Sequence, residues 1–225
     1  MDQSVKSMQT MNKTRDYTLF DRLCLGADQV VRALTNNAIT TGQPYPAKSV
    51  EDHPMTTEQR KHAAALMRIN HTGEICAQAL YHGQGLVSRS PVIQEKMQQA
   101  AIEEGDHLAW CKQRLNELGS HTSYLNPLWY AGSFCIGMAA GMVGDKWSLG
   151  FVAETERQVI NHLEKHLNLL PATDQRSYEI LKKMENDEAK HRDEAIISGA
   201  KELPSPVKLA MNFMSKIMVK TVYWL

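Results

Sequence analysis

Two stretches of this 225-residue chain repeat one pattern, a glutamate followed three residues later by a histidine. The stretches are Glu104–His107 and Glu188–His191. Residues three apart lie on one face of a helix, so each stretch can direct a carboxylate and an imidazole toward a single point. Either motif alone is a weak signal, because such a pair can also sit exposed on a helix surface. The position of the motifs in the chain therefore has to decide their meaning.

Each motif has a partner glutamate at an equal distance from a helix break. The midpoint between Glu74 and Glu104 falls inside the sequence Ser-Arg-Ser-Pro, and the midpoint between Glu156 and Glu188 falls inside Leu-Pro-Ala-Thr-Asp. Antiparallel helices joined by a short loop bring residues level when they are equidistant from the turn. The sequence therefore predicts two helical hairpins, each with a glutamate on its first arm level with the motif on its second.

At two of the predicted ligand positions, another glutamate lies nearby in the sequence, so the sequence has to decide which of the two points inward. Glu156 is expected to point inward because the residues one turn away from it are apolar, whereas the neighbours of Glu154 are polar and indicate a face in water. Glu104 is preferred over Glu103 for the same reason, and also because Glu103 can pair with Asp106 three residues later. Charges on an apolar face are costly unless they are paired or bind a metal ion.

The predicted cluster has the chemistry of a two-metal site. Apposed carboxylates repel one another unless cations lie between them. Two divalent cations would balance four carboxylates, and mixed oxygen and nitrogen ligands suit iron or manganese better than a tetrahedral zinc site. The pattern is that of di-iron carboxylate bundles. We expect two bridging glutamates and one histidine for each metal, in a ligand set of Glu74, Glu104, His107, Glu156, Glu188 and His191, with Glu104 and Glu188 as the bridges.

Four other side chains could lie near this site. His71 precedes Glu74 by three residues and is either an outer hydrogen-bond partner of a ligand or a core histidine. His162 could exchange a proton near the site. For His166, we favour the interpretation that it forms a surface pair with His162. Tyr81 is more readily explained as a core aromatic than as a redox or gating residue.

Helical periodicity and breaks predict an all-α fold, a ferritin-like four-helix bundle with a di-iron centre. We expect an N-terminal extension and linker over residues 1–55 and the ferritin-like domain over residues 56–225. Residues 1–15 should be disordered and 17–37 helical. The core helices are expected at about 58–87, 91–118, 148–169 and 173–198, with caps at Thr56 or Thr57, Ser90, Ser148, and Thr173 or Asp174.

Two additional helices have more than one interpretation. Residues 128–144 contain no charge and are too short to span a bilayer, so they form either a buried core helix or a helix that lines an apolar cavity or dips into one leaflet. Residues 205–225 form an amphipathic helix whose polar positions are spaced by four, at Lys208, Asn212, Lys216 and Lys220. This helix packs either on its own bundle or on a membrane surface or partner.

Composition excludes several classes of protein. The 25 basic and 25 acidic residues balance, which argues against nucleic-acid binding. The four cysteines are widely spaced without a Cys-x-x-Cys pair, so neither a zinc knuckle nor a disulfide framework is expected. The polar N-terminus lacks the apolar core of a secretory signal, and no uncharged apolar run reaches 18 residues.

Several motifs occur in a fixed order along the chain. They are Arg-Ile-Asn-His-Thr-Gly-Glu at 68–74, the first Glu-x-x-His motif, Asn-Pro-Leu-Trp at 126–129 with the glycine-rich helix that follows, Glu156, and the second Glu-x-x-His motif. Together they resemble the demethoxyubiquinone hydroxylases of ubiquinone biosynthesis. The resemblance runs from about residue 57 to 225, and residues 1–55 lie outside it or match poorly. It places the family's iron ligands on the same six residues: Glu74, Glu104, His107, Glu156, Glu188 and His191.

The resemblance implies a di-iron monooxygenase that hydroxylates the ring of a polyprenylated methoxy-quinol with O₂. It also implies a peripheral protein on the cytoplasmic face of the inner membrane, with other proteins of ubiquinone biosynthesis as candidate partners. The chain has no Gly-x-Gly-x-x-Gly fingerprint, so we expect an external electron donor. The alternatives are a ferritin-like iron store or ferroxidase and a metal-free helical interaction protein.

Overall fold

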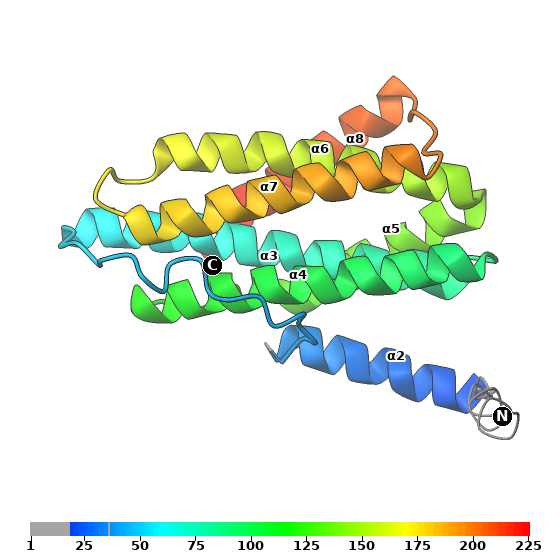
Figure 1. Ribbon diagram of the computed structural model, residues 1–225, viewed down its shortest axis with the longest axis horizontal. Coiled ribbons are helices and arrows are strands. Elements are labelled where there is room, and N and C mark those ends of the chain that lie inside the picture. The colour runs from blue at the N-terminus through cyan, green and yellow to red at the C-terminus, as the bar shows by residue number, and fades with distance from the viewer. Residues whose placement is uncertain (1–18, 36) are drawn as a thin grey trace, which may run out of the picture.

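The computed structural model describes residues 19–35 and 37–225, where every regular element is an α-helix (Figure 1). The prediction of an all-α fold is therefore confirmed. The predicted disorder of residues 1–15 and the start of the first helix lie outside the described residues. The helices are α2 (Leu19–Leu34), α3 (Thr57–Val87), α4 (Pro91–Glu117), α5 (Asn126–Val143), α6 (Asp145–Leu169), α7 (Gln175–Ile197) and α8 (Ser205–Val222).

Local sequence signals explain where most of the core helices begin. Thr56 caps α3 in a reciprocal arrangement with Gln59, Ser90 caps α4 ahead of Pro91, and Asp174 caps α7. The predicted cap of α6 is wrong. That helix begins after Gly144, whose φ of 120° ends α5, while Ser148 is buried inside α6 and accepts a hydrogen bond from Gln84.

The hairpins α3–α4 and α6–α7 pack into a four-helix core (Figure 1). Two apolar clusters lie along this core. One contains Met67, Leu115 and Met184, and the other contains Met97 and Val152. The two clusters leave between them the stretch of the bundle where the predicted ligands lie. Because apolar packing closes the bundle on both sides, charged groups at that level are removed from water.

Helix α5 runs along α3 at close range. A Cβ atom built on Gly137 would collide with the Leu80 carbonyl oxygen, and one built on Gly83 would collide with that of Phe134. These glycines therefore allow the two backbones to approach closely. The interpretation of α5 as a buried core helix is wrong, because much of its other face is exposed, including Leu128 and Met142.

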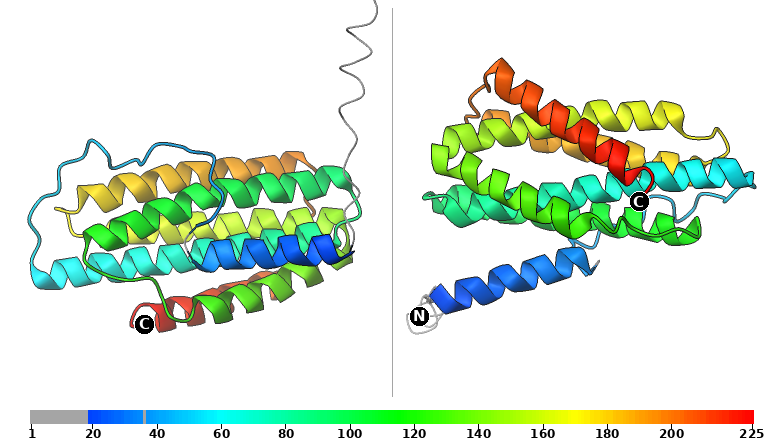
Figure 2. Two further views of the ribbon diagram at one scale, coloured as in Figure 1. Left: turned by 90° about the horizontal axis from the view of Figure 1, so that it is seen from below. Right: turned by 180° about the vertical axis from the view of Figure 1, so that it is seen from behind.

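Helices α5 and α8 lie on the same side of the bundle (Figure 2). The interior-facing residues of both line one apolar cavity, and large apolar side chains of both remain exposed. Within the part of the chain that the structure describes, no helix combines the length and hydropathy that a membrane span needs.

The segment between α2 and α3 packs tightly on the bundle. The Thr41 hydroxyl and the Gly42 backbone N–H donate to the Asp106 carboxylate, and Ala47 is fully buried. A Cβ on Gly105 would collide with the Ile39 carbonyl oxygen, which shows how closely this segment crosses α4. A domain boundary near residue 56 stays a prediction, and the segment before it contributes to the packing.

Candidate metal centre

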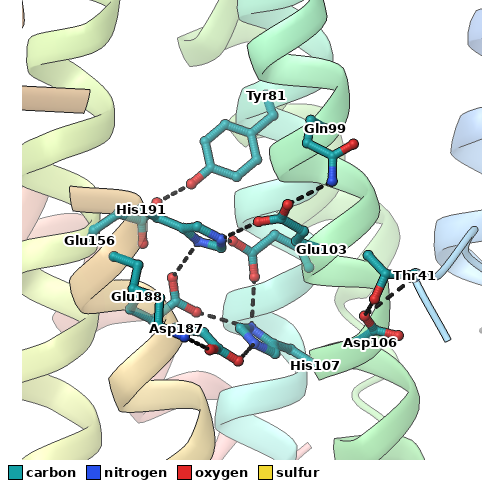
Figure 3. Close-up of polar contacts among 12 residues, drawn as sticks. Thr41, Tyr81, Gln99, Glu103, Asp106, His107, Glu156, Asp187, Glu188 and His191 are labelled. Atoms are coloured by element: carbon teal, nitrogen blue, oxygen red, sulfur yellow. Dashed lines mark hydrogen bonds and ion pairs between the residues drawn. The ribbon is translucent and has the colours of Figure 1, made fainter. Parts of the chain in front are cut away.

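The structure brings all six predicted ligands together in the middle of the core. Figure 3 shows four of them, His107, Glu156, Glu188 and His191. Donor atoms within 4.8 Å of one another define two overlapping groups, each with three carboxylates and one histidine. One group is Glu74, Glu104, His107 and Glu188, and the other is Glu104, Glu156, Glu188 and His191. Glu104 and Glu188 belong to both groups, the positions that two bridging ligands would occupy. That these side chains bind metal remains a prediction.

The residues of the cluster come from four helices. This agrees with the prediction that, in each hairpin, the ligands on the two arms lie at equal distances from the helix break. Helix α3 places Glu74 opposite the motif on α4, and α6 places Glu156 opposite the motif on α7. The four glutamates are between 0% and 4% exposed. Rigid helices with a fixed rise of about 1.5 Å per residue make this alignment predictable from sequence numbers alone.

Both histidines turn the same ring nitrogen toward the cluster. His107 Nδ1 lies 2.9 Å from Glu104 and 3.0 Å from Glu188. His191 Nδ1 lies 3.3 Å from each of the same two glutamates. The Nδ1 atoms are therefore the nitrogens positioned to bind a metal ion.

The opposite nitrogens contact two carboxylates that the sequence interpretation missed. His107 Nε2 lies 3.4 Å from Asp187, and His191 Nε2 lies 2.7 Å from Glu103 (Figure 3). The arrangement is reciprocal between α4 and α7, because each acidic residue directly precedes the motif glutamate of its own helix. Such partners fix the orientation of a ligating imidazole. An acidic residue immediately before each Glu-x-x-His motif was the available signal.

The expected pairing of Glu103 with Asp106 is wrong. Glu103 contacts His191 on another helix, whereas Asp106 accepts hydrogen bonds from Thr41 and Gly42. The two residues point to different sides of α4 (Figure 3). Glu103 therefore supports the candidate centre, and Asp106 anchors the preceding segment.

Burial and crowding govern protonation in this cluster. Burial, followed by the charges of neighbouring carboxylates, raises the pKa of Glu74 and Glu156 well above the ordinary range. Burial also acts to raise the pKa of Glu104, but the two histidines outweigh it and the pKa is lowered. For His107 and His191, burial lowers the pKa, yet hydrogen bonds to their acidic partners raise it overall. Protons can thus balance the charges of the metal-free cluster.

Two divalent cations could take the place of the protons on these glutamates and histidines. The net charge of the cluster would then stay the same. Glu104 Oε1 and Glu188 Oε1 have no hydrogen-bond partner in the described structure, although a histidine nitrogen lies 3.3 Å and 3.0 Å away, respectively. Buried carboxylate oxygens without a donor are costly. Because both belong to the shared glutamates, the donor set fits a pair of metal ions with these residues between them.

Of three neighbouring residues, two differ from their expected positions and one lies where it was expected. Glu154 is buried rather than in water, yet it faces away from the centre and pairs with Arg157 at 2.6 Å. His166 is also buried, and its Nδ1 lies 3.0 Å from Asn70 Oδ1. Tyr81 is in the core, as expected, and its hydroxyl donates a hydrogen bond to Glu156 (Figure 3). Tyr81 therefore contacts the candidate centre directly.

The candidate centre adjoins an apolar cavity of about 410 Å³ between α3, α5, α6 and α8. Glu74 forms part of the cavity wall, so a bound molecule could approach the carboxylates there. His162 lines the same cavity, and burial lowers its pKa to about 4. His71 is fully buried on α3 outside both ligand groups.

Comparison with known proteins gives a consistent result. The family model described as ubiquinone biosynthesis protein COQ7 matches residues 61–222. A protein of Acinetobacter baumannii is 54% identical over 94% of this chain and all of its own length, and one of Nitrosococcus oceani is 47% identical over 94% and 99%. One from Polynucleobacter necessarius is 53% identical over 90% and 97%. All three are named 3-demethoxyubiquinol 3-hydroxylase.

These alignments also correct one expectation. Residues 1–55 were expected to lie outside the resemblance or to match it poorly, and coverage of 94% of this chain shows that most of them do not lie outside it. The packing of Thr41 and Gly42 against Asp106 gives a physical reason, since this segment is part of the folded body. Given a family model that matches most of its length and relatives near 50% identity, the chain belongs to the family of ubiquinone biosynthesis protein COQ7.

Proposed function

We propose that this protein is a di-iron monooxygenase that hydroxylates the ring of demethoxyubiquinol, a polyprenylated methoxy-benzoquinol, in ubiquinone biosynthesis. The observation that carries the proposal is a buried cluster of four glutamates and two histidines that opens onto an apolar cavity at Glu74. A ferritin-like iron store would share the cluster. The relatives are named as hydroxylases, which favours the enzyme.

The six clustered side chains would hold two iron ions, with Glu104 and Glu188 shared between them. When bound, the iron supplies activation of O₂, which side chains cannot provide. Asp187 and Glu103 hold the two imidazoles in orientation, and the apolar clusters keep water from the centre. The overall reaction consumes quinol, O₂, two electrons and two protons, and forms the hydroxylated quinol and water.

The electrons would come from an external donor, and other proteins of ubiquinone biosynthesis are candidate partners. The test of function is lipid extraction from cells that lack this protein. We expect the methoxy-quinone that lacks one ring oxygen to accumulate, and the wild-type gene to restore ubiquinone. Ubiquinone levels that stay normal in the deletion strain, with no accumulated precursor, would contradict the proposed reaction.

A membrane surface is the proposed location, with the face formed by α5 and α8 against lipid. This face exposes Leu209 at 72% and Phe213 at 61% beside the cavity, together with basic residues such as Lys216. Such composition is typical of helices that lie in a membrane interface. A polyprenyl tail could then pass from lipid into the cavity, on the cytoplasmic side of the inner membrane.

Charge introduced on this face should release the protein from lipid. We expect Leu209→Glu together with Phe213→Glu to reduce flotation with anionic liposomes strongly, because two exposed apolar side chains no longer enter the interface. Leu86→Glu changes an exposed apolar residue at the end of α3 and serves as the matched control. Equal flotation of the double variant and the wild-type protein would exclude this face as the attachment surface.

A further inference from the structure

Tyr81 is a buried tyrosine whose hydroxyl reaches one of the candidate ligands. Its side chain is 1% exposed, and the hydroxyl donates a hydrogen bond to Glu156 Oε1 (Figure 3). The two residues are 75 positions apart and belong to different hairpins, Tyr81 to α3 and Glu156 to α6. This hydrogen bond therefore joins the two hairpins at the level of the candidate centre.

Helix α3 serves the two ligand groups in different ways. Tyr81 follows Glu74 by seven residues, close to two full turns, so both side chains lie on one face of α3. Glu74 belongs to the ligand group that contains His107, which we call the His107 position. Glu156 belongs to the group that contains His191, the His191 position. One face of α3 thus provides a ligand for the first position and a hydrogen-bond donor to a ligand of the second.

The two glutamates that each belong to a single group are held differently. Among the residues that the structure describes, Glu156 accepts a hydrogen bond from a hydroxyl group and Glu74 accepts none. Glu74 lies 3.7 Å from His107 Nδ1 and forms part of the wall of the apolar cavity. The candidate centre is therefore asymmetric, because the carboxylate of the His191 position carries a restraint that its counterpart lacks.

Packing from all four core helices fixes the phenol ring. Tyr81 belongs to an apolar cluster that also contains Met97 of α4, Val152 of α6 and Ala195 of α7. A side chain locked by its packing can hold a neighbouring ligand in a precise orientation. The hydroxyl is therefore a fixed point against which the Glu156 carboxylate is oriented.

A carboxylate can accept this hydrogen bond and still bind a metal ion. Its two oxygens offer about four acceptor positions, and a tyrosine phenol keeps its proton at pH 7. A carboxylate that is free to rotate loses that freedom when it binds a metal ion, and a hydrogen bond that already orients it reduces this cost. Removal of such an outer partner typically lowers metal affinity by about 10–100-fold.

We propose that Tyr81 is a positioning residue that orients Glu156 and thereby sets the metal affinity of the His191 position. The proposal rests on the proposed function, which requires iron at this centre, and it makes the two iron positions unequal. A purely structural tyrosine would need no more than some partner for its buried hydroxyl. The two roles differ in their effect on metal binding.

The test is an anaerobic calorimetric titration of the metal-free full chain with Fe²⁺ alone. We expect Tyr81→Phe, which removes only the hydroxyl, to weaken one of the two binding steps by about 10–100-fold and to leave the other unchanged. Tyr130→Phe is the matched control, because Tyr130 is also a buried tyrosine, and its hydroxyl lies 2.8 Å from His82 Nδ1 outside both ligand groups. This control should leave both steps unchanged.

Two double variants show which position is affected. In Glu156→Ala the strongest remaining step belongs to the His107 position, so the addition of Tyr81→Phe should leave it unchanged. In Glu74→Ala the strongest remaining step belongs to the His191 position, so Tyr81→Phe should weaken it by the same factor as in the wild-type protein. Equal losses in both backgrounds would mean that Tyr81 does not act through Glu156, and would overturn the proposal.

The outcomes separate this inference from the function on which it rests. Helical circular dichroism confirms that each variant is folded. If the wild-type protein binds no iron, the proposed function is overturned together with the role of Tyr81. If the wild-type protein binds two iron ions and hydroxylates the quinol, while Tyr81→Phe binds both ions as tightly or loses both equally, the positioning role alone is overturned.

Discussion

Replacement of Glu104 by alanine should remove bound iron and abolish hydroxylation. Glu104 belongs to both candidate ligand groups, so its loss takes an oxygen ligand from both positions at once. It also deprives His107 and His191 of a carboxylate that lies within 3.3 Å of their Nδ1 atoms. Loss of an outer partner of a metal ligand costs about 10–100-fold in affinity or activity, so loss of a shared ligand should cost at least about 100-fold.

The measurement is iron content after anaerobic purification, together with product formation from the quinol. Glu154→Ala is the matched control, because Glu154 is likewise a buried glutamate of the same bundle, 5% exposed against 0% for Glu104, but pairs with Arg157 away from the centre. The control should keep both iron and activity. Retention of iron by Glu104→Ala, or its loss only from Glu154→Ala, would mean that the cluster is not the metal site.

Circular dichroism distinguishes loss of ligation from loss of the fold in this experiment. In the metal-free protein, Glu104 shares a buried space with three other carboxylates, and burial and crowding raise the pKa of Glu74 and Glu156. Removing one carboxylate relieves repulsion, so the helical signal of Glu104→Ala should persist. A variant that is helical but free of iron would locate the defect in metal binding.

The positions of the candidate ligands along the bundle axis were predictable, because these positions depend on helix geometry alone. Glu74 and Glu156 lie level with their motifs since the intervening loops are short and the helical rise is constant. The caps at Thr56, Ser90 and Asp174 were equally local, each read from a side chain and the residues next to it. These features require no knowledge of which helices are neighbours.

Burial by a third element could not be predicted in this way. Glu154 has polar neighbours on its own helix, but Gln158 beside it donates to the Lys208 carbonyl, so α8 covers that face. His166 is buried because α3 presents Asn70 to it. Periodicity shows which face of a helix is polar and does not show whether another helix covers that face.

Polar contacts between distant segments were missed for the same reason. Asp187 and Glu103 each stand next to a predicted ligand, but their role depends on the pairing of α4 with α7. Asp106 holds a segment more than 60 residues earlier in the chain. Arg114 is the largest example, a fully buried arginine on α4 to which the sequence interpretation assigned no role.

Arg114 joins three separate parts of the structure. Its guanidinium lies 2.8 Å from Asp174, the cap of α7, and 3.0 Å from Glu117 on its own helix. It also reaches Asp52 in the segment before α3 and donates to the Ser177 hydroxyl. Nearby acidic groups raise the arginine pKa although burial lowers it, so the charge persists inside the protein.

Arg114→Met should therefore destabilise the fold by about 3–5 kcal/mol, because it leaves the buried Asp174 carboxylate without its cation. For a chain of this size, that corresponds to a fall in Tm of roughly 10 °C, measurable by scanning calorimetry. Arg192→Met is the control, since Arg192 is partly exposed, pairs with its neighbour Asp193 alone among the described residues, and should change stability by less than about 0.5 kcal/mol.

A second substitution tests the physical reason for this loss. If the cost comes from an unpaired buried charge, then Asp174→Asn in the Arg114→Met background should recover part of the stability, because a neutral amide can still cap α7. If the cost comes from lost packing around the arginine stem, the double variant should be no more stable than Arg114→Met. An Arg114→Met protein that melts within about 2 °C of the wild type would show that the buried network contributes little to the fold.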